Sequence, residues 1–205
     1  MLESLAGIEP RFVLSGGAAL AGVHLGHRTT RDLDLFWRLR AELGELPRTV
    51  EQRLTRNGVS VETVQTAPSF TRFRISDGSS VVLLDLISEP MDAVDAAESH
   101  HLAGKEILVD SRRSILAEKL CALLERSELR DLVDVEALVR SGQSLEMAIA
   151  DAPKRDSGFS ALTLAWVLRD FDVAGMAKTS ELTADAPRLE VFREELIETL
   201  VSPNR

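Results

Sequence analysis

A chain of 205 residues, of which 44% are hydrophobic and 28% charged, has the composition of a folded globular protein. Its net charge of −9 does not favour nucleic-acid binding by the protein as a whole, and no apolar run approaches the ~18 residues of a membrane span. The single Cys121 excludes an intrachain disulfide, and the first residues lack the features of a signal peptide. We therefore expect a cytoplasmic protein without a membrane partner.

The beginning of the chain has the pattern of an α/β region. Residues 11–17 (RFVLSGG) predict a short strand that runs into a glycine turn, and residues 18–26 predict a buried helix. Residues 32–37 (DLDLFW) predict a second strand. An amphipathic helix is expected over residues 45–57, with Gly58 as its stop signal.

Further strands follow before the pattern changes. We expect them at residues 59–65, 70–76 and 81–88. Residues 77–80 (DGSS) predict the hairpin turn between the last two of these strands. Residues 90–104 are expected to form a loop with some helix, and residues 105–110 (KEILVD) a short edge strand.

The rest of the chain is helical in pattern, with apolar residues at helical spacing. Helices are predicted at residues 111–125, 129–142, 144–152, 159–171 and 187–201. Strands followed by helices favour an α+β fold. We therefore predict a head domain at residues 1–110 and a helical domain at residues 111–205.

Two aspartates stand one residue apart in the strand at 32–37. Residues i and i+2 of a strand share a face, so Asp32 and Asp34 lie side by side while Leu33 and Leu35 point to the core. Adjacent carboxylates repel each other, and their pKa values rise unless a cation neutralises them. A hard divalent ion such as Mg²⁺ is the natural partner, because it prefers oxygen ligands.

A third carboxylate interrupts the apolar strand VVLLDLIS. Asp85 is costly to bury alone, so it needs a partner. On a strand beside Asp32 and Asp34 it completes a site for two metal ions. The alternative is that Asp85 pairs with Arg72 or Arg74, or faces solvent at a sheet edge.

A glycine pair precedes the aspartates. Gly16 and Gly17 end a strand and open a helix, where backbone N–H groups bind phosphates, and Ser15 adds a hydroxyl. Fourteen residues separate Gly17 from Asp32. The whole series is a stronger signal for a phosphate site than the glycine pair alone.

The stretch SGGAALAGVHLGHRTTRDLDLF resembles the signature of the polymerase-β-like nucleotidyltransferases, and within them the AbiEii/AbiGii toxin family. The resemblance implies an α+β head with a mixed sheet flanked by helices, followed by a helical region. It implies that Asp32, Asp34 and Asp85 are catalytic and bind metal. It also implies that Ser15, Gly16 and Gly17 hold the nucleotide phosphates.

The same resemblance implies a reaction. Such enzymes use two Mg²⁺ ions to move a nucleoside monophosphate from an NTP to an acceptor hydroxyl, with release of pyrophosphate. Several of them are the toxins of toxin–antitoxin pairs, and some modify tRNA. We therefore expect a tRNA or another RNA as the acceptor and a cognate antitoxin protein as a partner.

Two helical motifs also resemble the family, LAEKLCAL and RDLVDVEAL. Lys119 lies within the apolar stripe of its helix, so it reaches either a buried anion such as a triphosphate or Asp131 of the next helix. In the functional interpretation Lys119 is catalytic and binds the nucleotide, and Asp131 orients it or the base. Asp134 is expected nearer the polar edge of the helix, and the choice between Asp131 and Asp134 as the functional acid stays open.

The remaining candidates are basic and sulfur side chains. Arg28 is placed to contact a phosphate. His24 and His27 form an H-x-x-H pair and His100 begins a second histidine cluster, but no cysteine pattern supports a zinc site. Cys121 has no evident histidine partner, and we interpret it as structural.

Two other functions stay open. The first is nucleotidyl transfer to a protein or a small molecule, which the net acidity of the chain favours over an RNA acceptor. The second is a degenerate protein that only binds a nucleotide or a partner. The three aspartates argue against it, because a binding protein has no need of mutually repelling carboxylates.

Overall fold

The computed structural model describes residues 2–30, 32–180 and 185–202. The chain divides into two compact units: Met1–His24 with Thr30–Ser111, and Leu25–Thr29 with Arg112–Arg205. The short segment Leu25–Thr29 therefore belongs to the helical unit, although the chain around it belongs to the first unit. The predicted division into a head domain at residues 1–110 and a helical domain at residues 111–205 stays a prediction.

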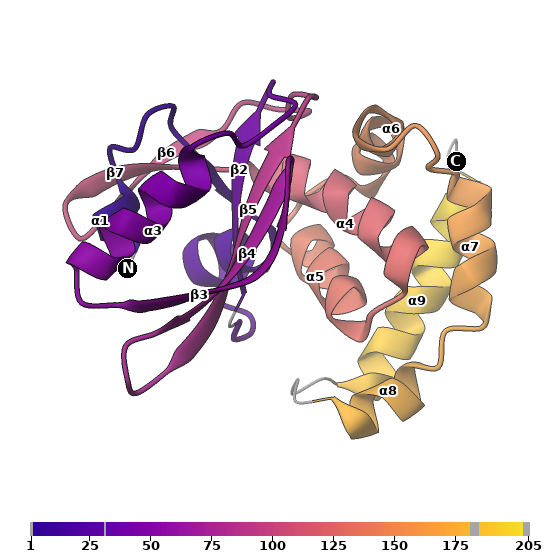
Figure 1. Cartoon of the computed structure of the whole chain (residues 1–205). Helices are drawn as coiled ribbons and strands as arrows, with labels where there is room; N and C mark the ends of the chain where they lie inside the picture. The colour runs from indigo at the N-terminus through magenta and orange to yellow at the C-terminus, as the bar shows by residue number, and fades with distance from the viewer. Residues whose placement is uncertain (1, 31, 181–184, 203–205) are drawn as a thin grey trace. The chain divides into compact units, whose positions relative to one another are not determined.

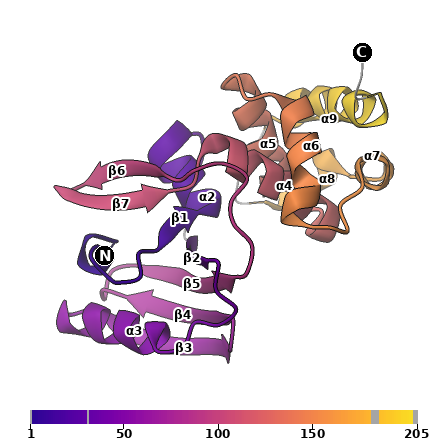
Figure 2. The same ribbon diagram turned by 90° about the horizontal axis from the view of Figure 1, so that it is seen from above.

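Within the described residues the first unit is built on a mixed seven-stranded sheet (Figures 1 and 2). The order of its strands is β3-β4-β5-β2-β1-β7-β6. The strands are β1 (Val13–Ser15), β2 (Asp32–Arg38), β3 (Ser60–Ala67), β4 (Phe70–Ser76), β5 (Val81–Glu89), β6 (Glu98–Leu102) and β7 (Lys105–Val109). Strand β2 is parallel to β5 and β1 is parallel to β7, whereas the other neighbours are antiparallel. The structure confirms the predicted α+β class.

Burial of apolar side chains decides which way β2 faces. Leu35 and Trp37 are fully buried, and Leu35 lies opposite Leu86 of β5 on the same face. Burying one such side chain stabilises the fold by ~1.5–3 kcal/mol. Because side chains alternate along a strand, Asp32 and Asp34 are directed to the other face.

The first unit also contains helical segments. They are α1 (Leu2–Leu5), α2 (Gly16–Ala18), the π-helix η1 (Ala19–Leu25) and α3 (Leu46–Arg56). Helix α3 buries Leu46, Val50 and Leu54, which recur every four residues, and it contacts α1 and β3. It ends before Gly58, whose φ of 79° is the left-handed conformation expected of a stop signal.

Two predictions near residue 100 are wrong. Residues 98–102 form strand β6 and not a loop with some helix, and β7 is not an edge strand because it pairs with both β1 and β6. The sequence ESHHL lacks the alternating apolar residues that indicate a strand. It becomes one because Ala103 and Gly104, with φ of 47° and 77°, form a two-residue hairpin turn.

The second unit consists of helices. They are α4 (Arg112–Arg126), α5 (Leu129–Arg140), α6 (Leu145–Arg155), α7 (Ala161–Arg169), α8 (Val173–Thr179) and α9 (Ala186–Val201). Several begin at a side-chain cap; for example, Ser144 and Ser160 each accept a hydrogen bond from a backbone N–H three residues on. The sequence did not predict α8, which is short. No helix in the described part of the chain has both the length and the apolar character needed to cross a membrane.

The single cysteine lies on α4 of the second unit. The thiol of Cys121 donates to the carbonyl oxygen of Ala152 over 3.5 Å. Burial, reinforced by the charges of Asp156 and Glu118, raises the pKa of Cys121 to about 12. The thiol therefore stays protonated near neutral pH, which is unfavourable for a nucleophile.

Candidate active site

A row of polar side chains crosses the middle of the sheet in the first unit. Asp34 of β2 lies directly opposite Asp85 of β5, and Ser15 of β1 lies opposite Asp34 on the other side. Paired residues of neighbouring strands share a face, and Asp32 shares it as well because it is two residues from Asp34. Adjacent strands lie ~4.8 Å apart, so the three predicted carboxylates are close neighbours.

The row continues to an arginine on β4. Arg72 lies opposite Asp85, and its Nε and Nη2 donate to the two carboxylate oxygens over 2.7 and 2.6 Å. The hydrogen bond to Asp85 raises the pKa of Arg72 against the effect of burial, and the charges of Asp32 and Asp34 add to the rise. An arginine partner for Asp85 was one of the alternatives left open by the sequence. The guanidinium reduces the repulsion among the three carboxylates.

The glycine turn adjoins this row. Helix α2 begins at Gly16, which has a φ of 62°, directly after the fully buried Ser15. A Cβ built on Gly16 would overlap Oδ2 of Asp34, so any other residue would displace that carboxylate. Gly16 thus allows the backbone to approach Asp34 closely. Gly17 follows as a buried residue of α2.

The donor set of the row fits a hard cation. Asp32, Asp34 and Asp85 offer carboxylate oxygens from adjacent strands, which are the ligands that Mg²⁺ prefers. The absence of a side chain at Gly16 lets the Asp34 carboxylate lie directly against the glycine turn. The metal-binding and catalytic roles of the three aspartates stay predictions.

The second unit contains its own network of buried charges. Lys119 of α4 is 6% exposed, and its Nζ lies 2.9 Å from Oδ1 of Asp131 and 2.8 Å from Oδ2 of Asp134, both on α5. Arg126 donates to Asp131 from Nε and Nη2, each over 2.8 Å. The ion pair of Lys119 with Asp131 is the alternative that the sequence left open.

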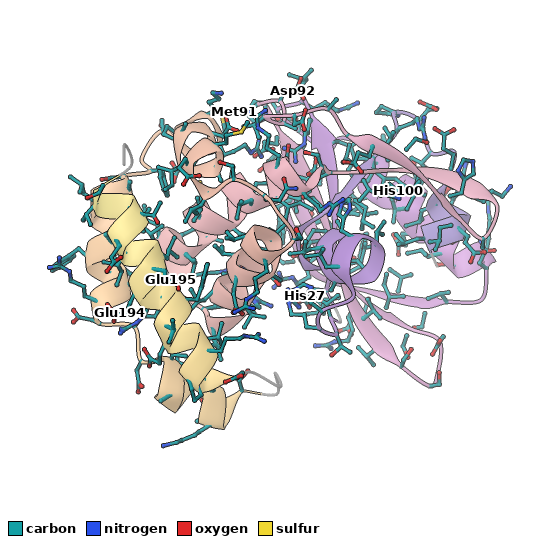
Figure 3. All side chains as sticks on the ribbon, turned by 180° about the vertical axis from the view of Figure 1, so that it is seen from behind. His27, Met91, Asp92, His100, Glu194 and Glu195 are labelled. Atoms are coloured by element: carbon teal, nitrogen blue, oxygen red, sulfur yellow. The ribbon has the colours of Figure 1, made fainter. Side chains whose placement is uncertain are left out.

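The short segment Leu25–Thr29 joins the same network. Nε and Nη2 of Arg28 donate to Asp134 over 2.6 and 2.7 Å, and Nε2 of His27 lies 2.8 Å from Oδ1 of Asp134 (His27 is labelled in Figure 3). Asp134 is fully buried, so its expected place near a polar edge is wrong. A helical wheel cannot show this, because the groups that bury Asp134 come from more than 100 residues earlier in the chain.

We call this network the buried polar cluster; its members are His27, Arg28, Lys119, Arg126, Asp131 and Asp134. Burial alone raises the pKa of Asp134, but hydrogen bonds from Arg28 and His27 and the charge of Lys119 outweigh it and hold the pKa below its usual range. The same balance lowers the pKa of Asp131, where Arg126 and Lys119 oppose burial.

One ring nitrogen of the cluster has no hydrogen-bond partner. Nδ1 of His27 is buried without a partner among the described residues. Such a group suits a hydrogen-bonding ligand. The predicted phosphate contacts of Arg28 and Lys119 stay predictions, as does the predicted orienting role of Asp131. Sequence reasoning did not assign Arg126 or His27 to a site, although His27 stands next to Arg28.

Solved structures share this fold. The chain is 22% identical to a Helicobacter pylori protein that carries a provisional nucleotidyltransferase description, with a TM-score of 0.57 over 99% of this chain and 92% of that one. JHP933 from Helicobacter pylori is 23% identical, with a TM-score of 0.54 over 98% and 89% of the two chains. MenT4, a nucleotidyltransferase toxin from Mycobacterium tuberculosis, is 16% identical, with a TM-score of 0.55 over 95% and 85%. No curated protein sequence matches the chain.

The mixed sheet and these likenesses give the protein the fold of the polymerase-β-like nucleotidyltransferases. Residues 1–200 match the family described as nucleotidyl transferase AbiEii toxin, of the type IV toxin–antitoxin system. The chain belongs to this family of nucleotidyltransferase toxins. Membership indicates an NTP substrate, a divalent metal ion and an antitoxin as partner.

Proposed function

We propose that the protein moves a nucleoside monophosphate from an NTP to a hydroxyl group of RNA, with tRNA as the acceptor, in a Mg²⁺-dependent reaction. The toxin activity of the family is then the modification of that RNA, in the cytoplasm where NTPs and RNA are found, and a cognate antitoxin opposes it. The observation that carries the proposal is the row of Asp34 opposite Asp85, with Ser15 and Gly16 beside it.

The residues of the row have separate tasks in this proposal. Asp32, Asp34 and Asp85 hold two Mg²⁺ ions, which when bound neutralise the phosphates and lower the pKa of the acceptor hydroxyl. Asp85 accepts the proton of that hydroxyl once Arg72 releases it. The backbone at Gly16 and Gly17 and the hydroxyl of Ser15 bind the phosphates that leave as pyrophosphate.

The test combines the purified protein with Mg²⁺, total RNA and each of the four α-labelled NTPs in turn. We expect label on a tRNA-sized band with one NTP, and none with Asp32→Ala/Asp34→Ala. The matched control is Asp92→Ala/Asp95→Ala, which removes two exposed aspartates from the same unit and should keep full activity.

The net charge of −9 favours a second acceptor class, a protein or a small molecule. Metal-dependent NTP binding without label on RNA would move the acceptor to that class. If no NTP binds in the presence of Mg²⁺, the catalytic interpretation of the row is wrong.

A further inference from the structure

Two histidines and a glutamate from distant parts of the sequence meet at the β6 edge of the first unit. His24 lies near the end of η1, and Glu98 and His100 lie on β6. One potential ligand atom of each residue lies within 4.8 Å of those of the other two. The rings of His24 and His100 pack edge to face, with centroids 5.5 Å apart and planes at 87°.

A hydrogen bond fixes the tautomer of His24. Its Nε2 lies 2.8 Å from the carbonyl oxygen of Asp110. A carbonyl oxygen only accepts hydrogen bonds, so Nε2 carries the proton and Nδ1 presents its lone pair. Histidines that bind metal ions are commonly held in this way, through a bond from the other ring nitrogen to a carbonyl oxygen or a carboxylate.

Strand geometry presents the other two side chains together. Glu98 and His100 are two residues apart on β6, so they share a face, and Nε2 of His100 lies 3.3 Å from Oε2 of Glu98. Their side chains are 48% and 32% exposed, which leaves the group open to ions from solvent (His100 is labelled in Figure 3). His101 points to the opposite face, where it pairs in register with Glu106.

This group is separate from the carboxylate row. Strand register pairs Glu98 with Val109, Val109 with Leu14, and Leu14 with Leu35. The group therefore lies on the sheet face that buries Leu35, whereas Asp34 belongs to the other face. The two sets of side chains have different donor chemistry as well as different faces.

We propose that His24, Glu98 and His100 bind a divalent transition-metal ion of the Zn²⁺ class. Two imidazole nitrogens and one carboxylate oxygen form a ligand set that suits Zn²⁺, whereas Mg²⁺ prefers oxygen ligands alone. Three protein ligands leave one coordination position for water. The ion fastens the β6–β7 hairpin, at the edge of the sheet, to the end of the helix that follows the glycine turn.

The probe is Co²⁺, which occupies Zn²⁺ sites and absorbs visible light strongly in tetrahedral coordination. The full chain, without an affinity tag and freed of metal, is titrated with Co²⁺. We expect the tetrahedral absorption to saturate at one ion per chain, to be lost on addition of one equivalent of Zn²⁺, and to survive excess Mg²⁺. Zn²⁺ should also raise the melting temperature of the chain.

Matched variants locate the ion. His24→Ala and His100→Ala should each weaken Co²⁺ binding at least tenfold and abolish the shift in melting temperature, whereas His101→Ala should bind as the natural chain does. Glu98→Gln, an exposed change, should weaken binding and leave the fold intact by circular dichroism. Asp32→Ala/Asp34→Ala should retain the absorption, which separates this proposal from the proposed reaction.

Three results would overturn the proposal. They are the absence of tetrahedral Co²⁺ absorption in the natural chain, binding that survives in both His24→Ala and His100→Ala, and displacement of the ion by Mg²⁺.

Discussion

Arg72 is the cation that acts most directly on the negative charge of the carboxylate row. Its forked pair with Asp85 and the fields of Asp32 and Asp34 all act on one guanidinium, which is 39% exposed. A metal ion that takes Asp85 as a ligand competes with this guanidinium for the negative charge of the carboxylate. Arg72 is therefore a competitor of the metal as well as a neutralising charge.

We predict that Arg72→Gln tightens Mg²⁺ binding. Removing the positive charge that pairs with Asp85 and feels the charges of Asp32 and Asp34 should lower the Mg²⁺ dissociation constant roughly tenfold, because a partly exposed charge acts through a high effective dielectric. Isothermal titration calorimetry with Mg²⁺ in the absence of NTP measures this constant.

Arg74→Gln is the matched control. Arg74 lies two residues away on the same strand and pairs with the exposed Glu62 over 3.0 Å. It should change the dissociation constant far less than Arg72→Gln. Weaker Mg²⁺ binding by Arg72→Gln would show that Arg72 supports the metal site instead of competing for it.

Single residues also show how far the sequence alone leads. The period of two in DLDLFW was enough to place Asp32 and Asp34 on one face, because a strand permits no other arrangement. It was not enough to choose between a metal and Arg72 as the partner of Asp85. The predicted turn at residues 77–80 already places Arg72 opposite Asp85, but a sequence pattern does not show whether the guanidinium or a metal ion holds that carboxylate.

At the scale of elements, the turn from β1 into α2 is the most constrained part of the first unit. Gly16 combines a φ of 62° with the close approach to Asp34. We predict that Gly16→Ala costs ~1 kcal/mol or more of stability through the left-handed backbone alone, with a further cost from the displaced carboxylate. It should also remove Mg²⁺ binding, measured by the same calorimetric titration.

Gly22→Ala provides the comparison for this turn. Gly22 lies in η1, and a Cβ built there meets no atom within 4 Å. This variant should keep both its melting temperature and its Mg²⁺ affinity. If Gly16→Ala binds Mg²⁺ normally, Asp34 is not a ligand in the way proposed.

Elements also mark where sequence patterns stop being informative. The apolar spacing that predicts α3 is present because Leu46, Val50 and Leu54 are buried. Strand β6 has no such spacing, because its side chains are mostly exposed at the edge of the sheet. Its pairing with β7, and not burial of apolar side chains, holds it as a strand. Helix α8 is short, and its cap at Asp172 is the main local signal for it.

At the scale of the whole molecule, residues 25–29 belong to the second unit, although the chain before and after them belongs to the first unit. The buried polar cluster holds this segment in the second unit. Asp134 fixes this segment, because its carboxylate contacts both His27 and Arg28. Removing one partner of a buried ion pair costs ~3–5 kcal/mol, so Asp134→Asn should lower the free energy of unfolding by an amount near this range.

The cluster also predicts a dependence on pH. The pKa of Asp134 is lower in the folded chain than its unfolded value of ~3.9, so its ionisation stabilises the fold above that value and the stabilisation is lost as pH falls through the folded pKa. Urea unfolding at pH 7 and at pH 3 should show a smaller loss of stability for Asp134→Asn than for the natural chain. An equal loss in both would mean that Asp134 does not carry this dependence.

Asp151→Asn is the control for Asp134→Asn, because it separates the loss of the contacts to residues 25–29 from a general loss of stability. Asp151 is also buried and paired, but its partners Arg113 and Lys154 lie on helices α4 and α6 and not in residues 25–29. Both variants should be less stable, yet only Asp134→Asn should speed hydrogen exchange at the amides of residues 25–29.

The thiol of Cys121 has a practical consequence for such measurements. With a pKa of about 12 and a hydrogen bond to Ala152, it reacts slowly with alkylating reagents at neutral pH. A cysteine placed at an exposed position, such as Arg48→Cys on α3, would then be the one fast-reacting thiol of the chain. A fluorescent or spin label can therefore be attached at a chosen site without first altering the natural sequence elsewhere.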